Sequence, residues 1–192
     1  TVDDLHTAPK QLYDDKIKKL NTKTTGKLII KEYPTASAHS GHFRALINEL
    51  SLKKDFIPEV VFIDYLNICS SSRFKGGNIS SYFYIKAIAE ELRGLAVEFK
   101  VPIFSATQTT RSGFVSTDIG LEDTSESFGL PATADFMFAL MSNDELEALG
   151  QMKVKQLKNR YNDPSVNKTF VIGVDRAKMR LYDVEGSAQT LV

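Results

Sequence analysis

The chain has 192 residues but only one cysteine, Cys69, and no excess of charge of either sign. A lone cysteine excludes an intramolecular disulfide framework and a cysteine-built zinc site, and it fits a reducing compartment. Because 24 basic residues balance 24 acidic ones, no global field draws the chain to nucleic acid or to an acidic membrane surface. Any binding of nucleic acid therefore has to be local.

Long apolar runs are also lacking. Val60–Ile63 is apolar but ends at Asp64, far short of the ~20 residues that a membrane-spanning helix needs. Thr1–Leu20 is rich in Asp and Lys and contains no apolar segment of the kind found in signal peptides. We therefore expect no membrane partner.

The composition that remains is that of an ordinary globular protein, with 42% hydrophobic and 25% charged residues. This excludes a disordered, collagen-like or coiled-coil chain. The length fits one compact domain, so residues 1–192 are expected to form a single domain.

Apolar, β-branched runs alternate with segments of helical period, which predicts an α/β fold with a mostly parallel sheet and flanking helices. The last two runs follow each other directly, so we expect the sheet to end in an antiparallel hairpin around Asp175–Lys178. The predicted helices are Asp4–Lys19, Ser40–Leu52, Ser80–Lys100 and Asn143–Gly150. The predicted strands are Lys27–Tyr33, Val60–Leu66, Val101–Thr107, Phe136–Met141, Met152–Leu157, Thr169–Val174 and Met179–Val184.

Two of these strands end in polar residues suited to nucleotide chemistry. Asp64 follows an apolar strand, where a carboxylate can hold the water shell of Mg²⁺, although it can equally cap the strand. Gln108 follows the next strand, where an amide can hydrogen-bond a γ-phosphate, although a polar turn explains it as well. Polar loops follow at Ser70–Ser81 and Arg111–Ser127, and both are expected at the carboxyl ends of parallel strands.

Two further segments have two readings each. Asp123 and Glu126 stand three residues apart before a short helix, which is the spacing of a capping box. Lys153 and Lys155 alternate on one face of a strand, and Lys158 and Arg160 continue that spacing to where they can reach a phosphate. An edge strand guarded by lysines is the alternative.

In this order, the segments resemble the carboxy-terminal motor domain of DnaB-type replicative DNA helicases, which belong to the RecA-like ATPases. Residues 60–67 (VVFIDYLN) resemble the Walker B strand, and residues 104–114 (FSATQTTRSGF) the glutamine motif that opens a DNA-facing loop. Residues 123–135 (DTSESFGLPATAD) and 155–164 (KQLKNRYNDP) resemble the Glu-Ser motif and the Lys-x-Arg arm. The resemblance extends from about Leu28 to Val184.

The resemblance implies roles for individual residues. Asp64 would hold the Mg²⁺ of bound ATP through water, and Gln108 would sense the γ-phosphate. Arg160, accompanied by Lys158, would be the arginine finger that enters the site of the neighbouring subunit in a homohexameric ring. The two polar loops would face single-stranded DNA, with six candidate contacts: Arg73, Lys75, Gly76, Gly77, Arg111 and Gly113.

The resemblance also implies primase, helicase loader and polymerase partners and a cytoplasmic location. However, no Gly-x-x-x-x-Gly-Lys-Thr/Ser loop precedes Asp64, and Thr24–Lys27 is only a partial match. We therefore expect the chain to be the carboxy-terminal part of a longer helicase, without ATPase activity of its own.

Two alternatives remain open at the level of sequence. A RecA-type DNA recombinase shares the strand-end Asp and Gln and a DNA-facing loop. A module that binds single-stranded DNA or a ring without turning over ATP would also lack the phosphate loop.

Overall fold

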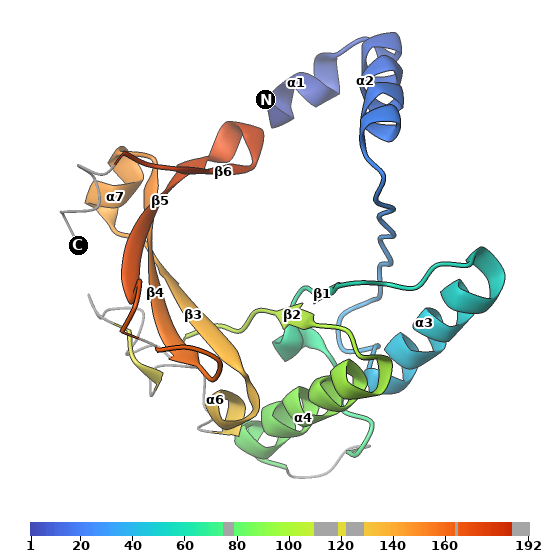
Figure 1. Cartoon of the computed structure of the whole chain (residues 1–192), viewed down its shortest axis with the longest axis vertical. Coiled ribbons are helices and arrows are strands. Elements are labelled where there is room, and N and C mark those ends of the chain that lie inside the picture. Colours follow the sequence, from blue (N-terminus) through green and yellow to red (C-terminus); the bar gives the residue numbers. More distant parts are fainter. Residues whose placement is uncertain (75–78, 110–118, 122–128, 164, 186–192) are drawn as a thin grey trace. The chain divides into compact units, whose positions relative to one another are not determined.

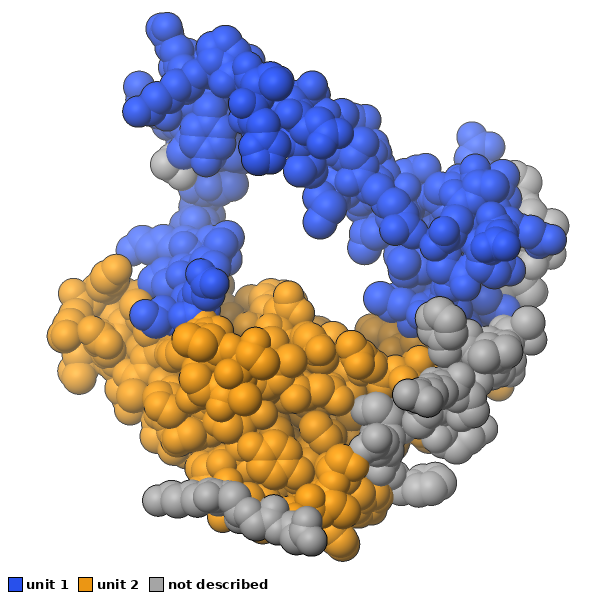
Figure 2. All heavy atoms as spheres, turned by 180° about the vertical axis from the view of Figure 1, so that it is seen from behind, with its two compact units in different colours: residues 1–32, 140–155, 169–192 blue, residues 33–139, 156–168 orange. Residues whose placement is uncertain are grey.

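The computed structural model describes residues 1–74, 79–109, 119–121, 129–163 and 165–185 (Figure 1). The chain divides into two compact units, which Figure 2 shows in different colours. Unit 1 comprises residues 1–32, 140–155 and 169–192, and unit 2 comprises residues 33–139 and 156–168. Asp64, Gln108, Lys158 and Arg160 all belong to unit 2.

Helix α4 (Ser81–Phe99) provides most of the core of unit 2. Its apolar residues recur three and four apart, so that they form one stripe along the helix. Ile88 and Leu95 are the most deeply buried of them, at 1% and 0% exposure. The helix ends at Phe99, and the next residue, Lys100, adopts the left-handed backbone conformation.

Strands β1 (Val61–Ile63) and β2 (Ile103–Ser105) pair in parallel, with Ile63 opposite Ser105. The crossover between them runs through α4, as a parallel pair requires. Val61, Ile63 and Ile103 pack on the core that α4 helps to form. The 3₁₀ helix η1 (Leu66–Ile68) follows β1 and adds Leu66 to that core, and Cys69 lies beside it as a small buried residue.

Two more helices pack against α4 in unit 2. Helix α3 (Ser40–Lys54) is joined to it by a two-pronged ion pair, in which Arg44 donates to both carboxylate oxygens of Glu98 at 2.9 and 3.0 Å. The short helix α6 (Gly129–Thr133) lies along α4 and buries Leu130 in the same core. Asp135 lies two residues beyond the end of α6.

Unit 1 is built from the amino-terminal helices and antiparallel strands. Its elements are α1 (Val2–Thr7), α2 (Lys10–Lys23), α7 (Asp144–Ala148), β5 (Thr169–Asp175), η3 (Arg176–Lys178) and β6 (Arg180–Asp183). Strands β3 (Phe136–Met141) and β4 (Gln151–Asn159) run from one unit into the other. The strand order is β3-β4-β5-β6, with antiparallel pairing of β4 to β5 and of β5 to β6.

Most predicted elements are confirmed, including the terminal hairpin, which turns through η3. The predicted strand Lys27–Tyr33 is wrong: these residues are described but form no strand, and Leu28 and Ile30 are 83% and 84% exposed. A β-branched run forms a strand only where another strand supplies hydrogen bonds and cover. The predicted helix Asp4–Lys19 is broken before Pro9, because a proline disfavours helical backbone at the residue that precedes it.

The alternative reading of Lys153 and Lys155 as guards of an edge strand is also wrong, because β4 has a neighbouring strand on each side. Within the described part of the chain, none of the helices is both long enough and apolar enough to span a membrane.

We expect Leu95→Ala to destabilise the fold by about 2–5 kcal/mol, because it opens a cavity at a fully buried position. The matched control is Val97→Ala on the same helix, where the side chain is 70% exposed and the expected loss is below about 0.5 kcal/mol. Chemical denaturation of both variants checks this. Equal losses would contradict the assignment of Leu95 to the core.

Candidate functional site

Asp64 and Gln108 emerge at the same edge of the parallel pair. Asp64 follows β1 directly and is exposed, and Gln108 lies three residues beyond the end of β2. The two strand ends are tied together, since Gln108 Nε2 donates to Tyr65 Oη at 3.3 Å and Thr107 Oγ1 donates to Asn67 Oδ1 at 2.8 Å. The structure thus brings together the two residues that the sequence predicted at neighbouring strand ends.

The Asp64 carboxylate suits a hard cation such as Mg²⁺, which prefers oxygen ligands and keeps several waters. Within the described ranges, no group of three or more His, Cys, Asp and Glu side chains is placed to hold a metal ion. A magnesium ion at Asp64 would therefore need phosphate oxygens and water as its other ligands.

The chain after η1 is held by a buried carboxylate, that of Glu91 on α4. Ser71 Oγ donates to Glu91 Oε1 at 2.6 Å, and Ser72 donates through its backbone N–H at 3.0 Å and its Oγ at 2.7 Å. Ser40 Oγ, at the start of α3, donates to Glu91 Oε2 at 2.6 Å. One side chain thus fixes both the first turn of α3 and the beginning of the predicted DNA-facing loop.

These hydrogen bonds also set the ionisation of Glu91. Burial by itself raises the pKa of a carboxyl group, but the bonds from Ser40, Ser71 and Ser72 outweigh it and lower the pKa of Glu91 to about 2. Glu91 is therefore a carboxylate at neutral pH.

The next residues of the loop lie against the first turns of α4. Arg73 pairs with Glu90, and a groove of about 580 Å³ runs beside them. Its lining combines basic and aromatic side chains: Arg73, Phe74, Phe83 and Lys86, with Ile79, Ser80, Ala87 and Glu90. Such a combination suits a nucleic-acid strand, whose backbone is anionic and whose bases stack.

The other predicted DNA contacts, Lys75, Gly76, Gly77, Arg111 and Gly113, lie outside the described residues, as does the predicted capping box Asp123–Glu126. Arg73 is the one member of that predicted set whose surroundings the structure describes.

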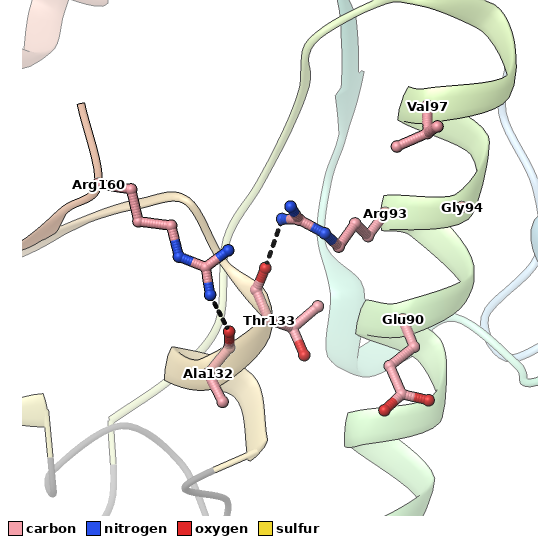
Figure 3. Close-up of a pocket in the computed structure, with 7 residues that line it drawn as sticks. All are labelled: Glu90, Arg93, Gly94, Val97, Ala132, Thr133 and Arg160. Carbon is pink, nitrogen blue, oxygen red and sulfur yellow. Dashed lines mark hydrogen bonds between the residues drawn. The ribbon is translucent and has the colours of Figure 1, made fainter.

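Lys158 and Arg160 are not brought to Asp64 and Gln108 but to the carboxyl end of α6. Lys158 Nζ donates to Pro131 O, Arg160 donates to Ala132 O at 2.7 Å, and Arg93 of α4 donates to Thr133 O at 2.8 Å. Figure 3 shows the two arginines reaching α6 from opposite sides. Three cations thus satisfy three consecutive carbonyls that have no partner within the helix.

Asp135 lies between the two arginines. Its Oδ1 accepts from Arg93 at 2.7 Å and from Arg160 at 2.9 Å. The hydrogen bond and the charge of Arg93, followed by those of Arg160, outweigh partial burial and keep the pKa of Asp135 below its usual value. Partial burial, together with the charge of Arg160, lowers the pKa of Lys158.

The two arginines line an open pocket of about 460 Å³ with Glu90, Gly94, Val97, Ala132 and Thr133 (Figure 3). A pocket with guanidinium groups on two sides suits an anionic group such as a phosphate.

Sequence reasoning missed three residues: Glu91, which binds the serines, and Arg93 and Asp135 at the carboxyl end of α6. Glu91 left a signal, because it stands three residues after Ile88 and four before Leu95, on the apolar face of α4. A charged residue at such a position requires a buried partner. Arg93 left no comparable signal, since an exposed basic residue on a helix is common.

Solved structures that share this fold include the following two. One, described as an ATPase domain, matches with a TM-score of 0.64 and 20% identity, over 77% of this chain and 52% of that one. The other, a DnaB-like replicative helicase described with its interactions with primase, matches with a TM-score of 0.66 and 20% identity, over 80% of this chain and 37% of that one. The chain therefore shares the fold of these two structures, an α/β fold as the sequence predicted.

Sequence comparison finds relatives among the replicative helicases. The chain is 43% identical over 185 residues to a DnaB-like replicative helicase of Enterobacteria phage T4. It is 29% identical over 189 residues to the replicative DNA helicase DnaB of Mycoplasma pneumoniae. No family model matches the chain.

These similarities confirm that the chain is related to the DnaB-type replicative helicases. They cover 96% and 91% of this chain but 39% of each curated relative, so the chain spans about two fifths of their length.

The carboxylate of Glu91 leads to a pH prediction. Because its folded pKa of about 2 lies below the ordinary 4.5, its stabilisation is complete above pH 4.5 and is lost as the pH falls toward 2. We expect Glu91→Gln to lower the free energy of unfolding at pH 7 by about 1–3 kcal/mol, because the serine hydroxyls lose their charged acceptor. The gap to wild type should shrink between pH 4.5 and pH 2.

The measurement is denaturant unfolding of both proteins across this pH range. Glu145→Gln on α7, where the side chain is exposed, is the control and should differ from wild type by less than about 0.5 kcal/mol throughout. A gap for Glu91→Gln that does not change with pH would rule out the buried carboxylate as its cause.

Proposed function

We propose that the chain acts as part of an ATP-dependent replicative DNA helicase of the DnaB type, a homohexameric ring that moves along single-stranded DNA and unwinds the duplex at the replication fork. The observation that carries this is the 43% identity to the phage helicase over 96% of the chain. The tied ends of β1 and β2 support it, because they present a carboxylate and an amide at one edge of a parallel sheet.

In this proposal Asp64 holds the Mg²⁺ of ATP through water, and Gln108 contacts the γ-phosphate. The metal, when bound, neutralises charge on the phosphates during hydrolysis. The bond of Gln108 to Tyr65 supports the assignment, because it fixes the amide beyond the strand end. The 192 residues contain no phosphate-cradling loop, so they hydrolyse ATP only as part of a longer chain.

Arg160 acts as the arginine finger in the site of the neighbouring subunit, with Lys158 beside it. The Arg160 side chain is 43% exposed, so a group of another subunit can reach it. A finger supplied in trans makes hydrolysis depend on assembly of the ring.

Single-stranded DNA binds along the chain after η1, with Arg73 as one phosphate contact. The serine bonds to Glu91 support this, because they hold the start of that segment against α4. Primase, a helicase loader and a polymerase are the protein partners we propose. The proposal of primase as a partner is supported by the structural neighbour that is described with its interactions with primase. The compartment we propose is the cytoplasm of an infected bacterial cell.

We expect Arg160→Ala to lower DNA-stimulated ATP hydrolysis by the assembled ring by about 10³-fold or more while leaving nucleotide binding intact, because it removes charge stabilisation from the transition state only. Steady-state hydrolysis and nucleotide titration in the longer, ATPase-competent chain check this. Arg176→Ala is the matched control, since Arg176 is an exposed arginine that pairs with Glu147 in unit 1. Retained turnover in Arg160→Ala would remove Arg160 from the site.

We expect Arg73→Ala to weaken binding of single-stranded DNA and to reduce the slope of log affinity against log salt by about 1, because it removes one phosphate contact. Fluorescence anisotropy with a labelled oligonucleotide over a range of salt concentrations measures both. Arg44→Ala, which breaks the ion pair between α3 and α4, is the control and should leave the slope unchanged. An unchanged slope in Arg73→Ala would exclude Arg73 from the DNA contacts.

A further inference from the structure

We propose that Asp135 is a positioning residue for Arg160 and that Arg93 holds Asp135 in place for this task. This inference rests on the proposed function, because it concerns how the arginine finger is aimed. Arg93 lies outside the sequence motifs described above, and Asp135, the last residue of the segment 123–135, was given no role there.

Arg160 is fixed at two points on one side of its guanidinium group. One nitrogen donates to Asp135 Oδ1 at 2.9 Å and another donates to Ala132 O at 2.7 Å. A guanidinium is planar and carries five N–H donors, so two fixed bonds define its plane and leave further donors for a second acceptor. Arg160 is thus held in one orientation while it lines an open pocket.

Asp135 is held in turn by Arg93. The Arg93 guanidinium donates to the same oxygen of Asp135 at 2.7 Å and to Thr133 O at 2.8 Å. Arg93 projects from α4 one residue after Leu92, which lies in the buried core, so its backbone belongs to a well-packed element. The order of support therefore runs from the core helix to Arg93, then to Asp135 and to Arg160.

The charges of these side chains make Asp135 necessary for the position of Arg160. Arg93 and Arg160 are like charges that meet at one carboxylate oxygen, and the charge of that carboxylate offsets their repulsion. Lys158, which donates to the preceding carbonyl of α6, adds a third cation. If Asp135 loses its charge, repulsion moves Arg160 away from Arg93 and out of its fixed orientation.

The test is kinetic and uses the longer, ATPase-competent chain assembled on single-stranded DNA. Asp135→Asn keeps the shape of the side chain and removes its charge. We expect kcat to fall by between about 10- and 100-fold, since misplacement of a catalytic group by about 1 Å has an effect of this size, with the KM for ATP unchanged. Arg93→Gln should lower kcat in the same way but less, and it decides the question if Asp135→Asn rings do not assemble. Arg44→Gln is the control on the neighbouring ion pair and should keep wild-type kcat.

A double-mutant cycle separates positioning from a general structural effect. In an Arg160→Ala background, Asp135→Asn should cause no further loss of kcat, because there is no guanidinium left to orient. A loss that persists in that background, or wild-type kcat in both Asp135→Asn and Arg93→Gln, would overturn the proposal. If Arg160→Ala itself keeps full activity, the finger assignment fails instead, so the two failures are distinguishable.

Discussion

The buried carboxylate of Glu91 is the interaction on which unit 2 depends. Burying an ionised carboxyl group is costly unless hydrogen bonds replace its water. Here three serine hydroxyls and one backbone N–H do so, from the start of α3 and from the loop after η1. The carboxylate therefore orders two segments that are far apart in sequence, and neither can move without leaving a buried charge short of a partner.

One turn of helix α4 carries Glu91 together with residues that contact Arg73 and Asp135. Glu90 pairs with Arg73 of the loop, Glu91 holds Ser71 and Ser72, and Arg93 pairs with Asp135. The same stretch of helix is anchored in the core by Leu92 and Leu95. The predicted DNA-facing loop and the predicted arginine finger are thus supported by neighbouring residues of one helix.

The local sequence pattern was sufficient to predict elements that are determined by residues close together in the chain. The apolar stripe of α4 and the hairpin at Asp175–Lys178 were predicted correctly because period and turn residues determine them. Lys27–Tyr33 has the composition of a strand, but pairing depends on another segment, which composition cannot reveal. The residues of the candidate site fall into the same two groups, those that local sequence predicts and those that depend on distant segments. Asp64 and Gln108 stand in recognisable motifs, whereas Ser40 meets Glu91 across 51 residues and Asp135 meets Arg160 across 25.

The bonds of Arg160 within its own chain are compatible with a role in a neighbouring site. When a phosphate also binds the guanidinium, a carboxylate that has this arginine as its single partner is left with less compensating charge. Asp135 has a second partner in Arg93 at 2.7 Å, so its charge stays compensated when a phosphate attracts Arg160. The shared carboxylate therefore holds the guanidinium in place before the phosphate arrives, and the N–H donors that Asp135 and Ala132 leave over remain available to the phosphate.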